Sequence, residues 1–502
     1  MDRTEVAIVG AGPASLAAAT TLGDHGIDVT VVDEQQRPGG QIYRRPPTSF
    51  RMESDPANGA GRELLEAAAS ATVRWATSTL VWGVSPNADA GGFTLALADD
   101  TGVRRLHTQR LLLAPGAYDL PVPFPGWTLP GVMSVGGVQT LLKSQGLVAG
   151  RRLALVGAHP LVLVVAAQLL RAGADVAAVA MAQPRPNPLR LLKSFGASPV
   201  ARQRLPEAIA SMRRLRANRV PFYTGKAIVA AEGTQSVESI RIDAVDGSWR
   251  PTGGAPVTID CDVAAIGYGF VPSIELARHL GCDEAWEPSA GGWVIRHDAW
   301  MAASRPGVYV AGEITGVAGA EQAADEGRMA ALGILRELGR VTPAAAERRA
   351  QRGRRQLRST RRFNRSMAEH FGPKLEALAD LAPDQAIVCR CEEITAGTLR
   401  EALAAHPHIA NLDALKLLTR AGMGPCQGRS CALAVQAIVA RERGITMAQA
   451  GCFAARPPLK PIRIGQLADA HDALTATQSA PAASADAHAL SPMTSSHSSV
   501  GP

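Results

Sequence analysis

Apolar positions near the start of the chain change their spacing twice within about thirty residues. Residues Val6–Val9 form an apolar run of strand type, residues Ala14–Leu22 have helical spacing, and residues Val29–Val32 return to a strand pattern. Gly10 and Gly12 separate the first strand from the helix. A strand, a glycine turn, a helix and a second strand in this order predict one βαβ unit.

The turn has the features of a dinucleotide site. Gly10 allows the tight bend, Gly12 lets a diphosphate approach the backbone, and the helix N-terminus supplies free N–H groups and a positive dipole end. Ser15 replaces the third glycine, and its small side chain is expected to be tolerated where helix and strand pack closely. Asp33 ends the second strand with a carboxylate suited to ribose hydroxyls.

The same pattern of strand, glycine, helix and strand returns at residues 151–182, with damage to the glycine motif. His159 occupies the second glycine position, Val162 occupies the third, and Ala180 and Met181 stand where an acid or arginine is expected. A side chain at position 159 would lie where a pyrophosphate needs bare backbone. We expect the fold to be retained without ordinary NAD binding, and His159 to cap a helix at the surface rather than bind another phosphate.

Later segments add further elements. Residues 206–216 predict a helix, and residues 237–242, 257–260 and 263–266 predict strands. Residues 395–405, 412–419 and 432–443 predict three helices near the end of the chain. From residue 475 onward the chain lacks apolar periodicity, which predicts a disordered tail.

Length and charge limit the possibilities. A chain of 502 residues is too long for one core, and 46% hydrophobic and 19% charged residues are ordinary for an α/β protein. The net charge of +7 owes much to an arginine-rich stretch at residues 346–365, which favours a solvated linker helix over a dedicated binding surface. Aromatic residues do not alternate with these arginines, and no nucleic-acid-binding motif is present, so nucleic acid is not an expected partner.

No segment reaches the roughly 20 apolar residues that a membrane-spanning helix requires. The charged residues 1–5 lead directly into the first strand, unlike a cleaved signal peptide. We expect a cytoplasmic location, with a peripheral position at the inner face of the membrane as a variant.

Seven cysteines are present, and four of them are clustered. Cys389 and Cys391 precede the predicted helices at 395–405 and 412–419, and Cys426 and Cys431 follow them. Helices that bring the two loops together would create a four-thiolate site suited to zinc or a 2Fe-2S cluster, with a redox disulfide as the third possibility.

The remaining cysteines, Cys261, Cys282 and Cys452, are isolated in the sequence and are expected to behave as small buried hydrophobes. The segment QIYRRPPTSF directly after Gly40 contains no cysteine pair, which disfavours disulfide-reductase chemistry.

Three segments together resemble the two-dinucleotide-domain flavoproteins. They are the opening unit with Gly39 and Gly40 after it, the segment Leu111–Trp127, and the segment Gly307–Ala331, which is similar to the family's closing motif with Glu313 in place of the usual aspartate. The resemblance implies FAD. The cofactor-binding residues expected on this basis are Gly10, Gly12, Pro13, Ala14, Ser15, Asp33, Glu34, Gly39, Gly40, Gln41, Gly116, Gly312 and Glu313.

The segments CRCEEIT and GPCQGRSC resemble the bacterioferritin-associated ferredoxin-like domain, a small helical 2Fe-2S module. This resemblance implies that Cys389, Cys391, Cys426 and Cys431 hold the cluster. Gly422, Gly424 and Gly428 would let the loop wrap it.

Over nearly its whole length the chain resembles the α (A) subunits of heteromeric amine and amino-acid dehydrogenases, a family that includes opine oxidase, hydrogen cyanide synthase and dye-linked proline or hydroxyproline dehydrogenase. The resemblance implies an FAD and 2Fe-2S electron-transfer subunit. Its partner would be a second flavoprotein (β or B) subunit carrying the amine-oxidising site. Further partners would be a small third subunit and a respiratory or dye acceptor. The alternatives are a stand-alone NAD(P)H-dependent reductase and a non-catalytic iron-sulfur redox partner. No catalytic residue is assigned.

The expected fold class is α/β, with two Rossmann-like dinucleotide-binding domains of the flavoprotein type and a small all-helical iron-sulfur domain. The expected boundaries are residues 1–120 with 285–340 for a discontinuous FAD-binding domain, 121–284 for the NAD-binding-like domain, 341–383 for a basic helical linker, 384–455 for the 2Fe-2S domain, 456–474 for an extended strap and 475–502 for the tail.

Overall fold

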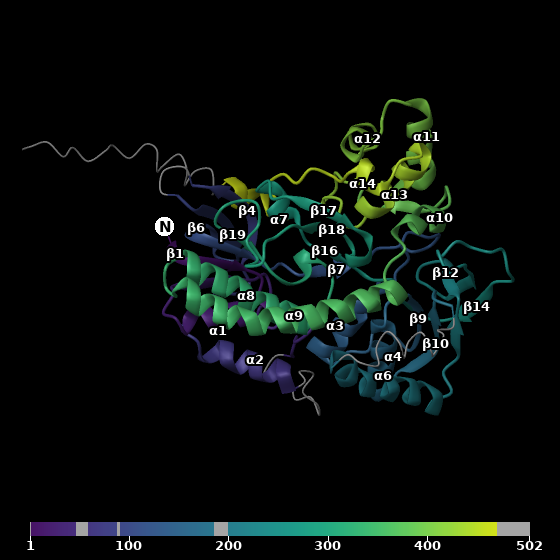
Figure 1. The fold of residues 1–502 in the computed structure, drawn as a ribbon. Coiled ribbons are helices and arrows are strands. Elements are labelled where there is room, and N and C mark those ends of the chain that lie inside the picture. The colour runs from purple at the N-terminus through teal and green to yellow at the C-terminus, as the bar shows by residue number, and fades with distance from the viewer. Residues whose placement is uncertain (1, 47–58, 88–90, 185–198, 469–502) are drawn as a thin grey trace, which may run out of the picture.

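A computed structural model of the chain describes residues 2–46, 59–87, 91–184 and 199–468. The predicted disordered tail at 475–502 lies outside these ranges. A mixed sheet and a parallel sheet, each covered by helices, form the body of the molecule, and a helical part stands at one end (Figure 1). The predicted α/β fold with two dinucleotide-binding units is confirmed. Within the described ranges, no helix combines the length and apolarity needed to cross a membrane.

The first sheet is organised around the strand that begins the chain. Its order is β3-β2-β1-β6-β5-β4, with β19 beside β6. β1 is parallel to β2 and β6, whereas β5 is antiparallel to β6 and β4. The strands are β1 (Asp2–Val9), β2 (Val29–Val32), β3 (Arg74–Ala76), β4 (Leu80–Pro86), β5 (Phe93–Asp99), β6 (Gly102–Leu113) and β19 (Val308–Val310).

β1 is buried on both faces, which explains its continuous apolar run. Val6 and Ile8 belong to a core that includes residues of α1 (Pro13–Gly23) and α8 (Ala320–Glu337). Ala7 and Val9 belong to the core on the opposite face. Strands of parallel sheets covered on both sides have no polar face, so they lose the alternation typical of half-exposed strands.

The second sheet has the order β11-β10-β9-β15-β8 with all neighbours parallel. Helices α3, α4 and α6 pack against one face of this sheet, and a small antiparallel sheet, β12-β13-β14, packs against its other face. The elements are β8 (Val132–Ser134), α3 (Val135–Gln145), β9 (Arg152–Gly157), α4 (Leu161–Arg171), β10 (Asp175–Met181), α6 (Pro199–Ala217), β11 (Phe222–Thr224), β12 (Lys226–Glu232), β13 (Ser239–Ala244), β14 (Val257–Asp260) and β15 (Val263–Gly267).

Two chain crossings join the sheets, and they pair with each other. The outward crossing contains β7 (Ala117–Asp119) and the return crossing contains β16 (Phe270–Pro272), which form an antiparallel ribbon. After the return, β19 rejoins the first sheet through β6. The remaining short elements here are α2 (Gly59–Ser70), α7 (Glu275–His279), β17 (Glu284–Glu287), η1 (Pro288–Ala290), β18 (Gly292–Ile295) and η2 (Gly312–Thr315).

The arginine-rich stretch forms one long helix, α9 (Pro343–Phe371), which crosses the front of the molecule in Figure 1. It is more than a solvated linker, because Ala346, Ala350, Leu357 and Phe363 are buried on one side of it. Arg361, from the same helix, pairs with a fully buried glutamate of α8. The helix is therefore docked against the first sheet's helices along much of its length.

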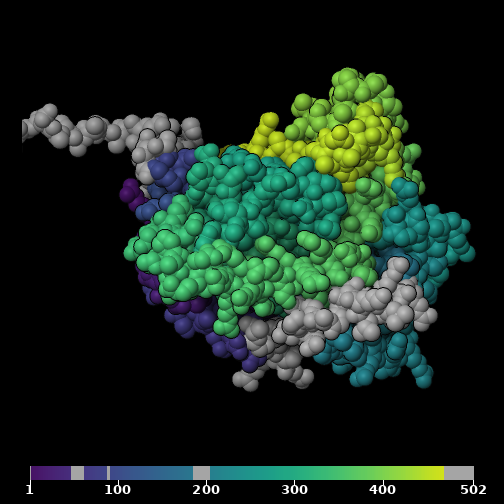
Figure 2. Space-filling view, in the orientation of Figure 1, coloured from purple at the N-terminus to yellow at the C-terminus, as the bar shows by residue number. Residues whose placement is uncertain are grey.

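The C-terminal part is mostly helical and forms a lobe at the top of Figure 2. All three helices predicted there are confirmed, the first beginning one residue later because Thr395 is its N-cap. The elements are η3 (Leu375–Ala377), α10 (Leu378–Leu381), β20 (Ile387–Cys389), β21 (Ile394–Thr395), α11 (Ala396–Ala405), α12 (Leu412–Thr419), α13 (Ala432–Arg443) and α14 (Met447–Ala450).

Candidate functional site

The first glycine turn lies at the carboxyl end of β1. Gly10 has a φ of 98°, and a Cβ atom there would overlap the Ala114 carbonyl oxygen at the end of β6. Only glycine satisfies both conditions. Gly10 is therefore required by the fold itself, quite apart from any ligand.

Gly12 differs from Gly10 in both respects. Its φ of −79° and ψ of −174° are accessible to any residue, and a Cβ atom there would have no neighbour within 4 Å. Open space thus lies in front of the turn, at the N-terminus of α1. The fold does not need glycine at this position, whereas a ligand lying against the backbone does.

A second glycine loop covers the turn from one side. The Gly39 amide donates to the Ala11 carbonyl at 2.8 Å, and a Cβ atom on Gly40 would lie 2.9 Å from the Gly12 Cα atom. Both glycines have positive φ angles. The structure therefore brings Gly39 and Gly40 against Gly12, while Gln41 beyond them is exposed.

The first turn of α1 contributes backbone donors and one unpartnered hydroxyl. Pro13 has no N–H group, and the amides of Ala14 and Ser15 lie in the first turn, where a helix offers no acceptor. The Ser15 hydroxyl is fully buried without a hydrogen-bond partner. A buried orphan hydroxyl costs free energy, so a partner outside the protein chain would stabilise this end of the helix.

Asp33 occupies the predicted position at the end of β2. Its carboxylate accepts hydrogen bonds from the Ala11 amide at 2.6 Å and the Gln35 amide at 2.7 Å. Burial raises the pKa of Asp33 above its ordinary value, although these two bonds oppose the shift. Asp33 thus supports the glycine turn directly and still faces the adjoining cleft.

Glu313 closes the site from the side of α8. Its carboxylate accepts hydrogen bonds from the amides of Ala318 at 2.8 Å and Gly319 at 3.0 Å, just before α8 begins. Burial raises its pKa to about 7. The adjacent Gly312 has a φ of 80° and lies close to Ala14, so the closing motif and the opening helix meet.

A second glutamate, which the sequence did not single out, holds the Glu313 turn in place. Glu326 of α8 is fully buried and accepts from the Gly312 amide at 3.0 Å and the Thr315 hydroxyl at 2.8 Å. Arg361 of α9 donates to the same carboxylate at 2.9 Å. The arginine-rich helix thereby contributes one of its charges to the support of the dinucleotide site.

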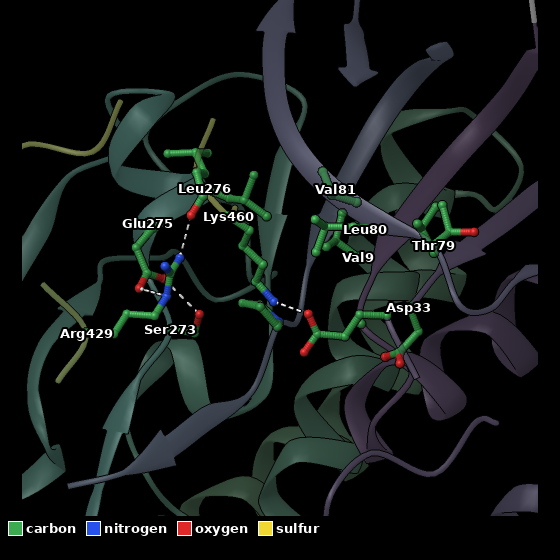
Figure 3. Close-up of a pocket in the computed structure, with 15 residues that line it drawn as sticks. Val9, Asp33, Thr79, Leu80, Val81, Ser273, Glu275, Leu276, Arg429 and Lys460 are labelled. Carbon is green, nitrogen blue, oxygen red and sulfur yellow. Dashed lines mark hydrogen bonds and ion pairs between the residues drawn. The ribbon is translucent and has the colours of Figure 1, made fainter. Parts of the chain in front are cut away.

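A cleft runs from Gly10 and Asp33 along the start of β4 and reaches the C-terminal segments (Figure 3). Two charged pairs line it: Lys460 pairs with Glu34, and Arg429 pairs with Glu275 at 2.8 Å. Its other lining residues are Val9, Val32, Thr79, Leu80, Val81, Pro115, Ser273, Leu276 and Leu459.

Gly116 lies next to this cleft, after Pro115. It has a φ of 81° and no atom within 4 Å of a would-be Cβ, and its carbonyl accepts from the Ser273 amide at 3.0 Å. The outward and return crossings are thus held together beside the cleft. Gly116 therefore lies beside the cleft, where a cofactor-binding residue is expected. Its contact with a cofactor stays a prediction.

The strap after residue 455 forms one wall of the cleft. The Leu459 amide donates to the Trp82 carbonyl of β4 at 2.7 Å, and the Gln466 side chain donates to the Asp99 carbonyl at 2.9 Å. These contacts tie the C-terminal segment to the first sheet. Nothing in the sequence indicated that Lys460 or Arg429 would face the same cleft as Gly10, because more than 400 residues separate them.

The four clustered cysteines come together as two pairs. Cys431 lies beside Cys389, and its thiol is the main cause that lowers the pKa of Cys389 to about 6. Cys391 lies beside Cys426 in the second pair, where the pKa of Cys391 is raised. In the described parts of the chain, no set of three or more Cys, His, Asp or Glu side chains already has a geometry that would hold a metal ion.

Glycines shape the loop around these thiols. A Cβ on Gly424 would overlap the Cys391 side chain, and side chains on Gly422 or Gly428 would overlap the Phe453 ring between them. The Gly422 amide also donates to the Cys389 sulfur at 3.5 Å. Four soft sulfur donors, one amide aimed at a sulfur and a glycine-lined loop fit the chemistry of a 2Fe-2S or zinc site.

The other three cysteines are not part of this cluster. Cys261 and Cys282 are buried and Cys452 is half-buried. Burial raises the pKa of each to about 11. Their thiols are thus protonated near neutral pH, as expected for inert hydrophobes.

In the second glycine turn, His159 behaves as predicted. Its Nδ1 accepts from the Leu161 amide at 3.2 Å and so caps the start of α4, while its ring packs edge-on against Phe270. The ring is half-buried rather than fully at the surface, and burial lowers its pKa to about 4. A neutral imidazole therefore fills the place of the second glycine.

Comparisons with known proteins agree with this architecture. Residues 4–329 match the family model of pyridine nucleotide-disulphide oxidoreductases, and residues 384–471 match that of the sarcosine oxidase A3 domain. The A subunit of opine oxidase from Agrobacterium tumefaciens (strain Ach5) is 35% identical over 93% of this chain and 92% of its own length. The HcnB subunit of hydrogen cyanide synthase from Pseudomonas aeruginosa is 33% identical over 84% of this chain and 90% of its own.

Among solved structures, L-proline dehydrogenase from P. horikoshii has a TM-score of 0.66 with 18% identity, covering 93% of this chain and 80% of that one. At this identity the likeness concerns the fold.

Proposed function

The chain belongs to the pyridine nucleotide-disulphide oxidoreductase family and, within it, to the flavoprotein A subunits of the opine oxidase type, and from this premise we propose that it is the electron-transfer subunit of a heteromeric amine dehydrogenase. It is an FAD-dependent oxidoreductase. In our proposal it holds FAD at the first glycine turn and a 2Fe-2S cluster at the cysteine loop. A second flavoprotein subunit would oxidise a secondary amine or amino acid, such as an opine, proline, hydroxyproline or a glycine-like substrate.

One observation carries the proposal. A glycine turn with open space and free amides, and a loop with four cysteines, occur in one chain and border one cleft. The turn offers open space at Gly12 and unpaired amides at Ala14 and Ser15. The cleft that begins at Gly10 ends at Arg429, inside the cysteine loop. When bound, FAD would supply two-electron chemistry and the cluster one-electron chemistry, which suits delivery to a respiratory or dye acceptor.

The protein residues have separate tasks in this scheme. The amides of the first helix turn bind the diphosphate, Asp33 orients the ribose, and Glu313 closes the opposite side. Cys389, Cys391, Cys426 and Cys431 hold the cluster. We assign no residue of this chain to amine oxidation, which in the proposal takes place on the partner.

His159 supports the entry of electrons from a partner rather than from nicotinamide. Its neutral ring fills the second glycine position at the start of α4, where a pyrophosphate would need bare backbone. This contact disfavours the alternative of a stand-alone NAD(P)H-dependent reductase.

Rapid mixing under anaerobic conditions tests the proposal. The chain is purified alone and together with the flavoprotein that co-purifies with it, and flavin absorbance is followed after addition of proline, hydroxyproline, sarcosine, an opine or NADH. We expect bleaching with one of the amines only in the complex. Bleaching of the isolated chain by an amine, or reduction by NADH at catalytic rates, would contradict the proposal.

A further inference from the structure

Arg429 belongs to two sites at once. It lies between Cys426 and Cys431 in the cysteine loop, and its side chain lines the cleft that begins at Gly10 (Figure 3). Only 19% of its side chain is exposed. A buried guanidinium in such a position needs partners on several sides.

Those partners come from three parts of the chain. Its Nε pairs with Glu275 at 2.8 Å, its Nη2 donates to the Leu459 carbonyl of the strap at 2.7 Å, and its Nη1 donates to the Cys426 carbonyl at 3.3 Å. The planar fork of a guanidinium satisfies several acceptors only in one orientation. The path of the cysteine loop therefore determines where this positive charge lies.

Glu275 is the group most affected by Arg429. Its side chain is 20% exposed and lines the same cleft, and its second oxygen accepts from the Ser273 hydroxyl at 2.8 Å. Arg429 forms an ion pair with it, and Arg278, which pairs with Glu284, also interacts with it electrostatically. Removing one partner of such a pair leaves an uncompensated charge at low dielectric, which is more costly than the pair is stabilising.

Tyr118 shows that the cysteine loop also reaches the crossing segment beside Gly116. Burial raises the pKa of Tyr118, and Glu275, Arg429 and Arg278 interact electrostatically with its hydroxyl. The loop and the flavin-side crossing thus share one buried polar environment.

We propose that Arg429 is a positioning residue that couples dinucleotide binding in the cleft to the closed state of the cysteine loop. The proposal rests on the proposed function, because it takes FAD and the cluster as the two ligands. With the loop closed, Arg429 neutralises Glu275 beside the site of an anionic dinucleotide. With the loop displaced, Glu275 loses this ion pair, and its negative charge disfavours an anionic dinucleotide in the cleft. Coupling of this kind is reciprocal, so bound FAD also stabilises the closed loop.

Fluorescence titration of FAD into the flavin-free full chain tests the coupling. We expect Arg429→Met to weaken FAD binding about tenfold. The affinity of Arg429→Lys should lie between those of the wild type and Arg429→Met, since lysine keeps the charge and loses the planar fork of donors. Arg443→Met is the matched control. Arg443 lies in the same lobe and donates to the carbonyls of Leu403, His406 and Ile409, but it does not line the cleft.

A double variant separates electrostatic coupling from a general loss of packing. Adding Glu275→Gln to Arg429→Met removes the unpaired charge, and we expect most of the lost FAD affinity to return. Equal weakening in Arg429→Met and Arg443→Met, or no recovery in the double variant, would overturn the coupling.

The cysteine loop provides the reciprocal measurement. A variant with serine at Cys389, Cys391, Cys426 and Cys431 should bind FAD about tenfold more weakly, and Arg429→Met should add little to that loss. Additive losses, or unchanged FAD affinity without the cysteines, would refute the coupling but not the proposed function. If the wild-type chain binds no FAD, the proposed function itself fails, so the two failures are distinct.

Discussion

Replacing Gly12 with valine should remove FAD without unfolding the protein. The backbone at Gly12 is extended, with φ −79° and ψ −174°, so valine fits it without strain. A Cβ atom would meet nothing within 4 Å. Loss of glycine from this N-cap position costs about 1 kcal/mol in folding free energy. The valine methyl groups would instead occupy the open space where we place the diphosphate.

The expected loss of affinity follows from the donors that valine would shield. The Ala14 and Ser15 amides can each donate to a charged phosphate oxygen, and such bonds contribute about 1.5–3 kcal/mol each. Losing both amounts to about 3–6 kcal/mol, so the dissociation constant for FAD should rise by at least about 100-fold.

The assay measures flavin content after purification, FAD affinity by fluorescence titration and the free energy of unfolding by denaturant. Gly247→Val is the matched control, because Gly247 also has unobstructed space for a Cβ and a φ outside the left-handed region, but it lies far along the chain in the second unit. Gly10→Ala is the contrasting variant and should destabilise the fold, since its Cβ would overlap the Ala114 carbonyl. A Gly12→Val protein that retains full flavin content would refute the site assignment.

Three further predictions concern other parts of the site. Cys431→Ser should reduce the iron content and visible absorbance of anaerobically purified protein, because a hydroxyl is a poor substitute for a soft thiolate, whereas Cys452→Ser should not; stoichiometric zinc without iron in the wild type would contradict the cluster assignment. Burial raises the pKa of Glu313 to about 7, so the folded, FAD-free protein holds this proton more tightly than the unfolded chain does. Its free energy of unfolding should therefore fall as the pH rises from about 4.5 to about 7, by at most about 3 kcal/mol, and denaturant titrations should show that Glu313→Gln lacks this component. Arg361→Met leaves a fully buried glutamate without its cation and should lower the free energy of unfolding by about 1–3 kcal/mol, while the exposed neighbour Arg362→Met should change it by less than about 0.5 kcal/mol; equal effects would contradict the role of the pair.

Local patterns in the sequence were sufficient for the elements of the first site. Residues Val29–Val32 were predicted as a strand and form β2, and residues 412–419 and 432–443 form helices with the predicted bounds. Runs of this kind are set by neighbouring residues, because strand burial, helical spacing and glycine turns all act over a few positions. The damaged second glycine motif was likewise recognised from local residues, with His159 and Val162 at the glycine positions.

The tertiary structure decided which of the predicted glycines are required by the fold. The sequence presents Gly10 and Gly12 as equivalent motif positions, yet only Gly10 meets a backbone oxygen from β6, a strand about one hundred residues later. That contact depends on the pairing of β1 with β6, which local spacing does not contain. The same reason explains why Glu326 and its partner Arg361 were not foreseen.

The charged residues of the cleft are the clearest case of long-range determination. Neither Lys460 nor Arg429 carried a local signal for this cleft, because an isolated cation in a loop has no period and the CQGRSC motif that contains Arg429 indicates only the cysteine site. They reach the cleft because the strap hydrogen-bonds to β4 and the cysteine loop packs beside α7. The sequence by itself determined the two candidate ligand-binding motifs, through patterns that act over a few residues. Only the fold decided that both motifs border one cleft, because contacts between segments hundreds of residues apart depend on how the whole chain packs.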